Sequence, residues 1–372
     1  MSQPKYVDIL YSRYLNEKNE VIIGGVQTYI TDLCQVCLEL DIKVRIIQFS
    51  KKDFVYVMPN GVKCFGFCVS EKKAKKRIEA LYDKSVMTRD SENTITLFAD
   101  NNTIPRKVKE KGLAIQHGIS WDVPEARERF WLKQLLSRMR RITELKQRMD
   151  NIDTLICVDY NFVNWYRTQV DIVKNEMKII PNYTKIMPPT NKPDNVVNII
   201  FARRLFDCRG TRVFTSAIKM VLENNSNVYV TIAGSGPDEQ FMKDNLSSFS
   251  NVIFTKYESY ESLDIHKTQH IAVVPSIGSE GTSLSLLEAM SAQCAVVCTD
   301  IGGLTNIVLD GFNGKMVEAG SVEQLYEAIK FLIENADERQ RLAENGYQTV
   351  KSAFSKEKWV QSWKRVFEAI LS

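Results

Sequence analysis

Short, almost continuously apolar segments alternate with segments of helical periodicity along most of this chain. The apolar segments have the length and β-branched content of strands and lie at 6–12, 44–49, 94–99, 154–159, 196–202, 228–234, 271–276 and 295–300. Strands that are apolar on both faces must be covered on both faces, as in parallel sheets. Apolar residues spaced three or four positions apart predict helices at 212–222, 237–246, 284–293 and 323–334. The alternation predicts an α/β protein built of doubly wound domains.

A proline-rich segment divides the chain into two parts. Residues 183–195, YTKIMPPTNKPDN, contain three prolines and few apolar residues, which is typical of a linker. At about 150 residues to a domain, a chain of 372 residues is expected to form two domains. We place the first at 1–185 and the second at 186–355. Doubly wound domains bind ligands beyond the carboxyl ends of their strands, so a site is expected in a cleft where the two sheets face each other.

The composition excludes several classes of protein. A hydrophobic content of 44% and a charged content of 25% fit an ordinary globular protein. The net charge of +4 is far from the strongly basic balance of a nucleic-acid binder. The N-terminal residues lack the apolar centre of a secretory signal, and no run approaches the ~18 consecutive apolar residues of a membrane span. We therefore expect a cytoplasmic protein with no nucleic-acid partner.

The cysteines allow two interpretations. Cys34 and Cys37 lie in one periodic apolar segment, and Cys64 and Cys68 lie in another, so the four could form a zinc site. Zinc ligands usually project from tight turns, which favours the alternative that these are buried thiols acting as small hydrophobic residues. Eight cysteines without a small, loop-rich scaffold also fit a reducing compartment.

The segment VVPSIGSEGTSLSLLEAM carries two carboxylates at the start of a predicted helix. A buried strand ends at Ser276, and the helix begins near Thr282 or Ser283, whose hydroxyls suit a helix start. The exposed N–H groups and the helix dipole make such a turn an anion site, suited to a diphosphate. Glu280 precedes the helix, and Glu288 lies eight positions later. One carboxylate can then address a reacting sugar while the other binds a ribose diol. The alternative is that Glu280 is only a turn residue and that Glu288 lies on a solvated helix face.

A second segment, VVNIIFARRLFDCRGTRVF, places cations directly after a buried strand. Arg203, Arg204, Arg209 and Gly210 precede a predicted helix. Cations at this point can neutralise the charge that develops on a diphosphate leaving group. A solvated basic loop is the alternative. The ends of neighbouring parallel strands meet at one edge of a sheet, so the joint occurrence of both segments favours a functional site.

Two glycine turns are weaker signals. Gly234 and Gly236 lie at a strand-to-helix turn with Pro237 as the expected first helical residue. Gly24 and Gly25 open a helix in the first domain, where the backbone can approach a phosphate closely or simply turn the chain.

Missing motifs narrow the chemistry. The chain has no Asp-x-Asp pair for a metal, no phosphate-binding GxxxxGK[ST] and no Gly-x-Ser-x-Gly nucleophile turn. We therefore expect neither a metal site nor a cofactor. Of the three histidines, His117 follows a short apolar run and precedes a glycine, as a residue at the rim of a cleft would. A structural histidine is the alternative.

These segments together resemble glycosyltransferase family 4, the group 1 glycosyltransferases with the two-domain GT-B fold. The resemblance covers essentially the whole chain and is strongest over 179–317. Its pieces are IIPNY, FARRLFDCRG, TIAGSGPDE, VVPSIGSEGTSLSLLEAM and TDIGGLTNIVLDGFNGKMV, in family order and spacing. The family fold implies two Rossmann-like domains that face each other across a cleft. It also implies that a last helix, 356–372 with Trp359 and Trp363, crosses back onto the first domain.

The resemblance implies roles for residues of the second domain. Glu280 would contact the donor sugar and Glu288 the nucleotide ribose, while Arg204 and Arg209 would neutralise the diphosphate. Further substrate-binding positions in this domain are Arg203, Gly234, Gly236, Gly281, Thr282, Ser283 and Leu284. Arg203 stands where the family commonly has glycine, which leaves its division of labour with Arg204 open.

In the first domain, the resemblance implies that Gly24 and Gly25 lie against the donor phosphates. His117 would lie near the transferred sugar as part of the catalytic set. Asn306 stands where many members carry glutamate.

The activity that the resemblance implies is retaining transfer of a hexosyl unit, without metal, from a nucleotide diphosphate sugar to an acceptor hydroxyl. The acceptor would be a saccharide or a lipid-linked saccharide, in bacterial surface polysaccharide or glycolipid assembly. Alternatives are a nucleotide-sugar epimerase on the same fold and a non-catalytic nucleotide-sugar-binding partner subunit. Glycoside hydrolases also use paired carboxylates, but the cationic loop would then have no role.

The segment 125–149 predicts a basic amphipathic helix. One face is an apolar stripe of Leu132, Leu135, Leu136, Met139, Ile142, Leu145 and Met149. The polar side carries Arg127, Arg129, Lys133, Arg138, Arg140, Arg141, Lys146 and Arg148, with Trp121 and Trp131 near the helix start. A second basic cluster lies at 71–77. Such a helix can dock on an anionic membrane, peripheral to the inner face of the plasma membrane. The alternative is that the stripe packs on the sheet and its charges are solvated.

Overall fold

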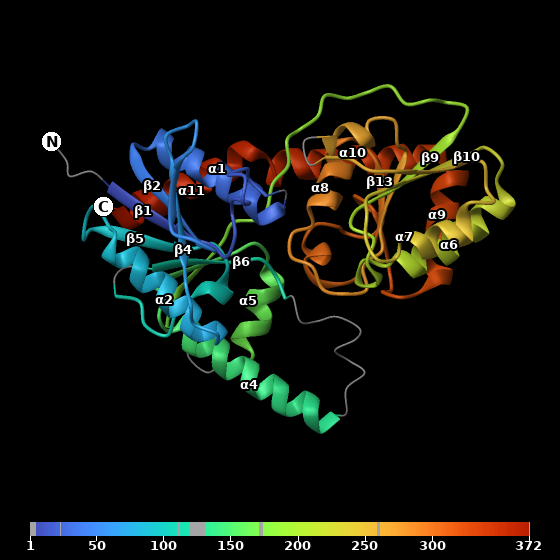
Figure 1. The fold of residues 1–372 in the computed structure, drawn as a ribbon. Coiled ribbons are helices and arrows are strands. Elements are labelled where there is room, and N and C mark those ends of the chain that lie inside the picture. The colour runs from blue at the N-terminus through green and yellow to red at the C-terminus, as the bar shows by residue number, and fades with distance from the viewer. Residues whose placement is uncertain are drawn as a thin grey trace.

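The structure is a computed structural model that describes residues 5–22, 24–109, 112–119, 131–170, 174–258 and 261–371. It contains two β-sheets, each flanked by helices (Figure 1). The strands of the first sheet are β1 (Lys5–Leu10), β2 (Ile42–Ser50), β3 (Phe54–Val57), β4 (Lys63–Cys68), β5 (Thr94–Phe98), β6 (Gly112–Gln116), β7 (Thr154–Cys157) and β8 (Glu176–Ile179). Their order is β3-β4-β2-β1-β5-β6-β7-β8, and only the pairing of β3 with β4 is antiparallel. The helices of this part of the chain are α1 (Gly25–Glu39), α2 (Ala74–Met87), α4 (Trp131–Met149) and α5 (Tyr160–Arg167).

The second sheet is entirely parallel. Its strands are β9 (Val197–Ala202), β10 (Val228–Ala233), β11 (Val252–Thr255), β12 (Ile271–Val274), β13 (Ala295–Thr299) and β14 (Lys315–Val317), in the order β11-β10-β9-β12-β13-β14. The helices that follow β9 in the chain are α6 (Thr211–Asn224), α7 (Glu239–Leu246), α8 (Leu284–Ser291), α9 (Val322–Glu334), α10 (Ala336–Ala353) and α11 (Lys356–Leu371). The strand order changes direction at β9 and β12, so the loops after these two strands lie together at the switch point where such sheets bind ligands.

The predicted doubly wound architecture is confirmed, and each of the eight predicted apolar runs overlaps a strand. The prediction missed six strands: β3, β4, β6, β8, β11 and β14. Apart from the six-residue β4, these have only three to five residues, and β3 alternates half-buried and exposed positions, which gives no apolar run. The expectation that Pro237 is the first helical residue was also wrong, because α7 begins at Glu239 and Pro237 precedes its N-cap residue.

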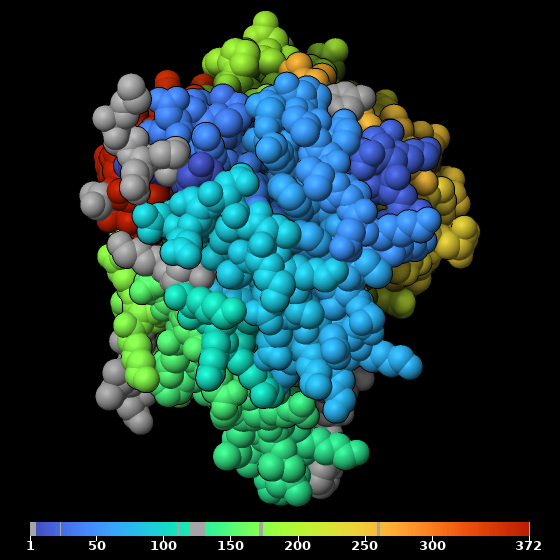
Figure 2. Space-filling view, turned by 60° about the vertical axis from the view of Figure 1, so that its left-hand side comes forward, coloured from blue at the N-terminus to red at the C-terminus, as the bar shows by residue number. Residues whose placement is uncertain are grey.

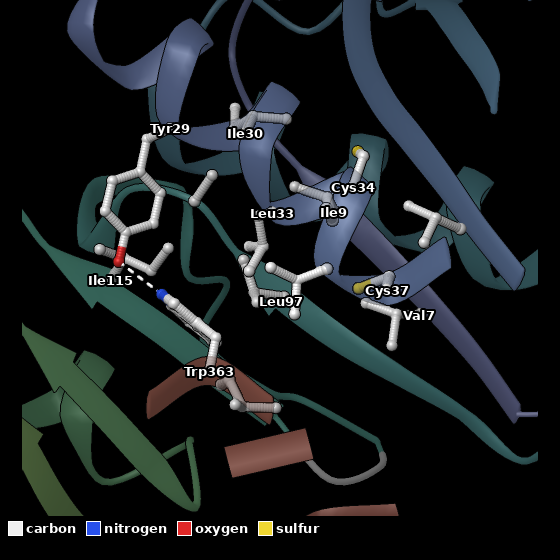
Figure 3. Packing of buried hydrophobic residues seen from close by; sticks show 14 of the residues in the cluster. Val7, Ile9, Tyr29, Ile30, Leu33, Cys34, Cys37, Leu97, Ile115 and Trp363 are labelled. Carbon is white, nitrogen blue, oxygen red and sulfur yellow. Dashed lines mark hydrogen bonds between the residues drawn. The ribbon is translucent and has the colours of Figure 1, made fainter. Parts of the chain in front are cut away.

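Both faces of each sheet are covered by apolar side chains. In the first sheet, Val7, Ile9 and Leu97 pack against Leu33 and its neighbours on α1 (Figure 3). The last helix, α11, belongs to the same core, and Trp363 Nε1 donates a hydrogen bond of 2.8 Å to the Tyr29 hydroxyl. The C-terminal helix therefore lies beside α1, although the chain reaches it from the second sheet (Figure 1).

The four cysteines of the zinc interpretation do not share one environment. Cys34, Cys37 and Cys64 lie in the apolar core of the first sheet, while Cys68 is exposed. Burial raises the pKa of the Cys64 thiol to about 12, so it stays protonated. Over the described ranges, no group of three or more His, Cys, Asp or Glu residues could hold a metal ion. Cys34, Cys37 and Cys64 are packing residues.

Helix α4 projects from the first domain (Figures 1 and 2). Of its apolar stripe, only Leu145 and Met149, at the C-terminal end, are buried. The exposed large apolar side chains of the other end are Trp131, Leu132, Leu135, Leu136 and Met139. The interpretation that the whole stripe packs on the sheet is therefore wrong for this end. Residues 125–130, with Arg127 and Arg129, and Trp121 lie outside the described residues. No described helix is long and apolar enough to cross a membrane.

Candidate active site

Glu280 lies in the loop between β12 and α8 and is surrounded by hydrogen-bond donors. Its Oε1 atom accepts hydrogen bonds from Arg203 Nη2 at 2.5 Å and from the hydroxyl of Ser276, and it forms an ion pair of 2.8 Å with Arg209 Nη1. Burial raises the pKa of this carboxyl, but the charges of Arg203 and Arg209 and the Ser276 hydroxyl outweigh it and lower the pKa to about 2. Glu280 is therefore a fixed negative charge at neutral pH.

The arginine that faces this carboxylate from the end of β9 is Arg203 and not Arg204. Arg203 is buried, and its Nη1 atom donates to Ser276 Oγ at 2.9 Å. Arg204 is exposed, and its guanidinium lies over the ring of Phe206, 5.6 Å from the ring centre. Successive side chains of an extended segment point to opposite sides, so only one of two neighbouring arginines can reach Glu280. The structure brings Arg203, Arg209 and Glu280 together and leaves Arg204 outside the cluster.

Backbone contacts hold the two loops of this cluster together. Gly210 has a φ of 78°, and a Cβ at this position would lie 1.7 Å from the carbonyl oxygen of Pro275. The N–H groups of Ile277 and Gly278 donate to the carbonyl of Cys208 at 3.1 and 3.0 Å. Only glycine fits here, and the close approach places Arg209 beside Glu280.

Gly234 and Gly236 support the cationic loop. A Cβ at these positions would lie 2.1 and 2.2 Å from the carbonyl oxygens of Arg203 and Leu205, respectively. The Leu205 N–H donates to Ser235 at 2.9 Å. These glycines therefore let the turn after β10 run along the backbone that carries Arg203.

Glu288 has a different environment from Glu280. It lies on α8, and its Oε1 atom accepts a hydrogen bond of 2.9 Å from Ser262 Oγ. Burial raises the pKa of the Glu288 carboxyl to about 7, although the Ser262 hydroxyl opposes the shift. Among the described residues, no cation forms an ion pair with it. Near pH 7 this carboxyl exists in both protonation states.

The first turn of α8 leaves backbone donors without a side-chain cap. The N-cap residue is Ser283, whose hydroxyl lies 3.2 Å from Ser285 Oγ and does not accept from the helix backbone. Leu284 at the first helical position is exposed. Gly281 and Thr282 lead into this turn, and Asn182 Nδ2 donates to the Thr282 carbonyl at 2.8 Å. The uncapped N–H groups and the helix dipole make this turn suited to an anion.

The N-terminus of α1 faces the N-terminus of α8. A Cβ on Gly25 would lie 3.5 Å from Cδ1 of Leu284, so the backbone of one domain contacts a side chain of the other. Gly24 is the N-cap residue of α1 and offers no side-chain cap. Two helix N-termini, one from each domain, therefore approach the same region.

His117 follows β6 and is held in one tautomer. Its Nε2 atom lies 2.9 Å from the carbonyl oxygen of Ala99, and a carbonyl only accepts, so Nε2 carries the hydrogen. Burial holds the pKa of the imidazole below its usual range. The ring of Tyr29 meets the imidazole edge-on, with ring centres 5.5 Å apart. His117 is thus neutral at pH 7, with Nδ1 as its acceptor.

The residues through which the first domain contacts the second domain near Glu280 could not be predicted from the sequence. A Cβ on Gly281 would lie 2.8 Å from Cγ2 of Val158 and 2.9 Å from the His117 carbonyl oxygen. The Thr282 hydroxyl donates to the Val158 carbonyl, and Tyr160 N donates to Asn306 Oδ1 at 3.0 Å. The sequence does show that His117 and Val158 lie at the ends of apolar runs. Which residues of the second domain they contact depends on the fold.

Residues 182–349 match the family of group 1 glycosyl transferases. The second domain is a group 1 glycosyl transferase domain. The matched range contains the Arg203, Arg209, Glu280 and Glu288 positions, so this part of the site lies within it.

Similar proteins agree with this assignment. The chain is 30% identical over 232 residues to an uncharacterized glycosyltransferase of Methanocaldococcus jannaschii, a match that covers 60% of this chain and 62% of that protein. It is 25% identical over 199 residues to a capsular polysaccharide biosynthesis glycosyltransferase of Staphylococcus aureus, covering 52% of this chain and 49% of that protein. The matches therefore span about half to three fifths of these relatives.

Among solved structures, sucrose-phosphate synthase of Thermosynechococcus elongatus superposes with a TM-score of 0.79 at 14% identity, covering 99% of both chains. At this identity the likeness concerns the fold. The expected GT-B arrangement of the group 1 glycosyl transferase domain and its N-terminal partner domain is confirmed.

Proposed function

We propose that this chain is a retaining glycosyltransferase that moves a hexosyl unit from a nucleotide diphosphate sugar to an acceptor hydroxyl. The observation that carries the proposal is the cluster in which Glu280 is held ionised by Arg203 and Arg209 beside the uncapped start of α8. A fixed carboxylate suits the hydroxyls of a sugar, and cations beside a helix N-terminus suit a diphosphate. The family match of the second domain supports the same class of reaction.

Each side chain has a role in this proposal. Arg209 and the first N–H groups of α8 bind the diphosphate and stabilise the charge that develops as it leaves. Glu280 binds hydroxyls of the donor sugar, and Glu288 binds the ribose diol. His117 accepts a hydrogen bond from the transferred sugar through Nδ1.

Transfer in this proposal needs no divalent cation, because the arginines and the helix terminus supply positive charge. Activity should persist in excess EDTA. Complete loss of activity that manganese restores would contradict this part of the proposal.

The proposed acceptor is a saccharide or a lipid-linked saccharide of a bacterial surface polysaccharide or glycolipid. The similarity to a capsular polysaccharide biosynthesis glycosyltransferase favours this class. The test is incubation with UDP-, GDP- and ADP-sugars and a panel of saccharide acceptors, with detection of the glycoside by mass spectrometry and of its anomeric configuration by proton NMR. A glycoside with the donor's configuration is expected, and an inverted product would contradict retention.

Two alternatives give different outcomes in the same assay. An epimerase would convert the donor sugar to an isomer without acceptor. A non-catalytic subunit would bind the nucleotide sugar and form no product. Either outcome would overturn the proposed transfer.

For the projecting half of α4 we propose docking on an anionic membrane from the cytoplasmic side. Five large apolar side chains are exposed there, beside cations that include Lys133 and Arg138. The second basic cluster, 71–77, contacts the other half of the same helix, because Lys75 Nζ forms an ion pair of 3.0 Å with Glu144 of α4. Each cation near an anionic surface contributes about 1 kcal/mol, and the apolar side chains can insert among the headgroups.

Flotation with vesicles tests this surface. The protein should float with phosphatidylglycerol vesicles at low salt, and less at high salt or with phosphatidylcholine alone. Leu136→Gln should reduce flotation, whereas Leu309→Gln should not, although the two leucines are similarly exposed at 60% and 63%. Absence of binding, or binding that ignores lipid charge, would contradict the docking.

A further inference from the structure

Two arginines bind one carboxylate oxygen in the cluster around Glu280, and they are held differently. The Arg203 side chain is 6% exposed and makes a second contact, from Nη1 to Ser276 Oγ. The Arg209 side chain is 24% exposed, and its ion contact is with Glu280. Arg203 is therefore fixed, and Arg209 is the arginine that can turn toward a ligand.

The charges of the cluster are not balanced. Two guanidinium groups share one carboxylate; burial, and to a lesser extent the charge of Arg209, lowers the pKa of Arg203. A second anion is therefore attracted to the cluster. The more exposed arginine is the group that this anion meets first.

We propose, building on the proposed function, that Arg209 is paired with Glu280 when no donor is bound. When the donor binds, its diphosphate replaces Glu280 as the ion-pair partner of Arg209, while Arg203 and Ser276 keep Glu280 in position for the sugar. Arg203 is a positioning residue in this scheme, and Arg209 is the exchangeable one. The exchange weakens binding of the bare diphosphate, because the ion pair between Arg209 and Glu280 must break before Arg209 can pair with the diphosphate. A nucleotide sugar regains this loss through the sugar's own contacts with Glu280.

The scheme predicts opposite effects of one substitution on two ligands. Glu280→Gln keeps the shape of the side chain and removes the charge that holds Arg209. Affinity for bare UDP, GDP or ADP, whichever binds the wild type most tightly, should rise about tenfold, the effect of one hydrogen bond to a charged group. The preference for the corresponding nucleotide sugar over the bare nucleotide should fall, because the sugar loses its carboxylate.

A double-mutant cycle separates exchange at Arg209 from a general change of charge. Calorimetric titration of the bare nucleotide is carried out on the wild type, Glu280→Gln, Arg209→Gln and the double variant. The gain from Glu280→Gln should disappear in the Arg209→Gln background, since no exchangeable arginine remains. Arg209→Gln leaves Glu280 paired with Arg203, so this variant is expected to fold, and its melting curve checks that.

The outcomes distinguish this inference from the proposed function. If the wild type binds none of the three nucleotides, the proposed function fails. If the wild type binds one and Glu280→Gln binds it equally or more weakly, the exchange is wrong while the donor site stands. A gain that persists in the Arg209→Gln background would also overturn the exchange.

Discussion

Glu280 and Glu288 lie within one turn-and-helix segment, yet their surroundings drive their protonation in opposite directions. Glu280 forms ion pairs with two arginines and accepts a hydrogen bond from the Ser276 hydroxyl, and its pKa falls to about 2. Glu288 accepts from the single hydroxyl of Ser262, and burial raises its pKa to about 7. The number of cations within reach decides which buried carboxylate keeps its charge.

The difference indicates two kinds of binding group. A carboxylate whose charge is already compensated is held rigidly and serves as a fixed point for a reacting sugar. A buried carboxylate with one hydroxyl partner still has unused acceptor capacity, and ligand hydroxyls can stabilise its ionised form. We therefore expect Glu280 to govern turnover and Glu288 to govern nucleotide affinity.

The largest effect is expected on turnover. Glu280→Gln should lower kcat at saturating donor by roughly 100- to 1000-fold, the usual loss when one group that stabilises a transition state is removed. Glu288→Gln is the matched control and should change kcat far less than it changes the donor KM. If both variants lose turnover equally, the two carboxylates do not divide the work in this way.

The next effect concerns pH. Because the free Glu288 carboxyl has a pKa of about 7 and the ribose diol favours the ionised form, nucleotide affinity should rise with pH through about 7 and then level off. Binding should be about tenfold weaker at pH 6 than at pH 8, as follows from the ionised fraction of such a group.

Glu288→Gln is the control for this pH profile, since nucleotide phosphates also titrate in this range. The component due to Glu288 should vanish in the variant while the phosphate component remains. Identical profiles for the two proteins would show that Glu288 does not titrate on binding.

A smaller effect is expected from the hydroxyl that supports Glu288. Ser262→Ala removes a hydrogen bond to the ionised carboxylate, so the pKa of Glu288 should rise further. A hydrogen bond worth about 1 kcal/mol changes the acid constant of Glu288 about fivefold, so at pH 7 the ionised fraction, and with it the nucleotide affinity, should fall about threefold, and the midpoint of the pH profile should move upward. A changed affinity with an unmoved midpoint would mean that Ser262 contacts the ligand itself.

The same comparison shows what the sequence could predict. Strand ends are readable as apolar runs, so the positions of Glu280, Glu288 and the arginines at one sheet edge followed from the sequence. Which neighbouring arginine faces inward did not, because side-chain alternation shows only that Arg203 and Arg204 point to opposite sides and not which of them faces Glu280.

Contacts between the two domains were also beyond the sequence. The approach of Gly118 to Gly281, where a Cβ would lie 2.7 Å from a backbone nitrogen, joins residues far apart in the chain. The exposure of the first half of α4 could not be predicted either, since the same periodicity fits a buried face and an exposed one. Periodicity defines a face of a helix, and only the fold shows what covers that face.

The most direct test of the account is a thermal-shift titration of UDP, GDP and ADP on the wild type and Glu288→Ala. One nucleotide should raise the melting temperature of the wild type, since a ligand at 100 times its Kd stabilises the native state by about 2.7 kcal/mol. At the same concentration, Glu288→Ala should show little or no shift. No stabilisation of the wild type by any of the three, or the same shift in both proteins, would contradict a nucleotide site at Glu288.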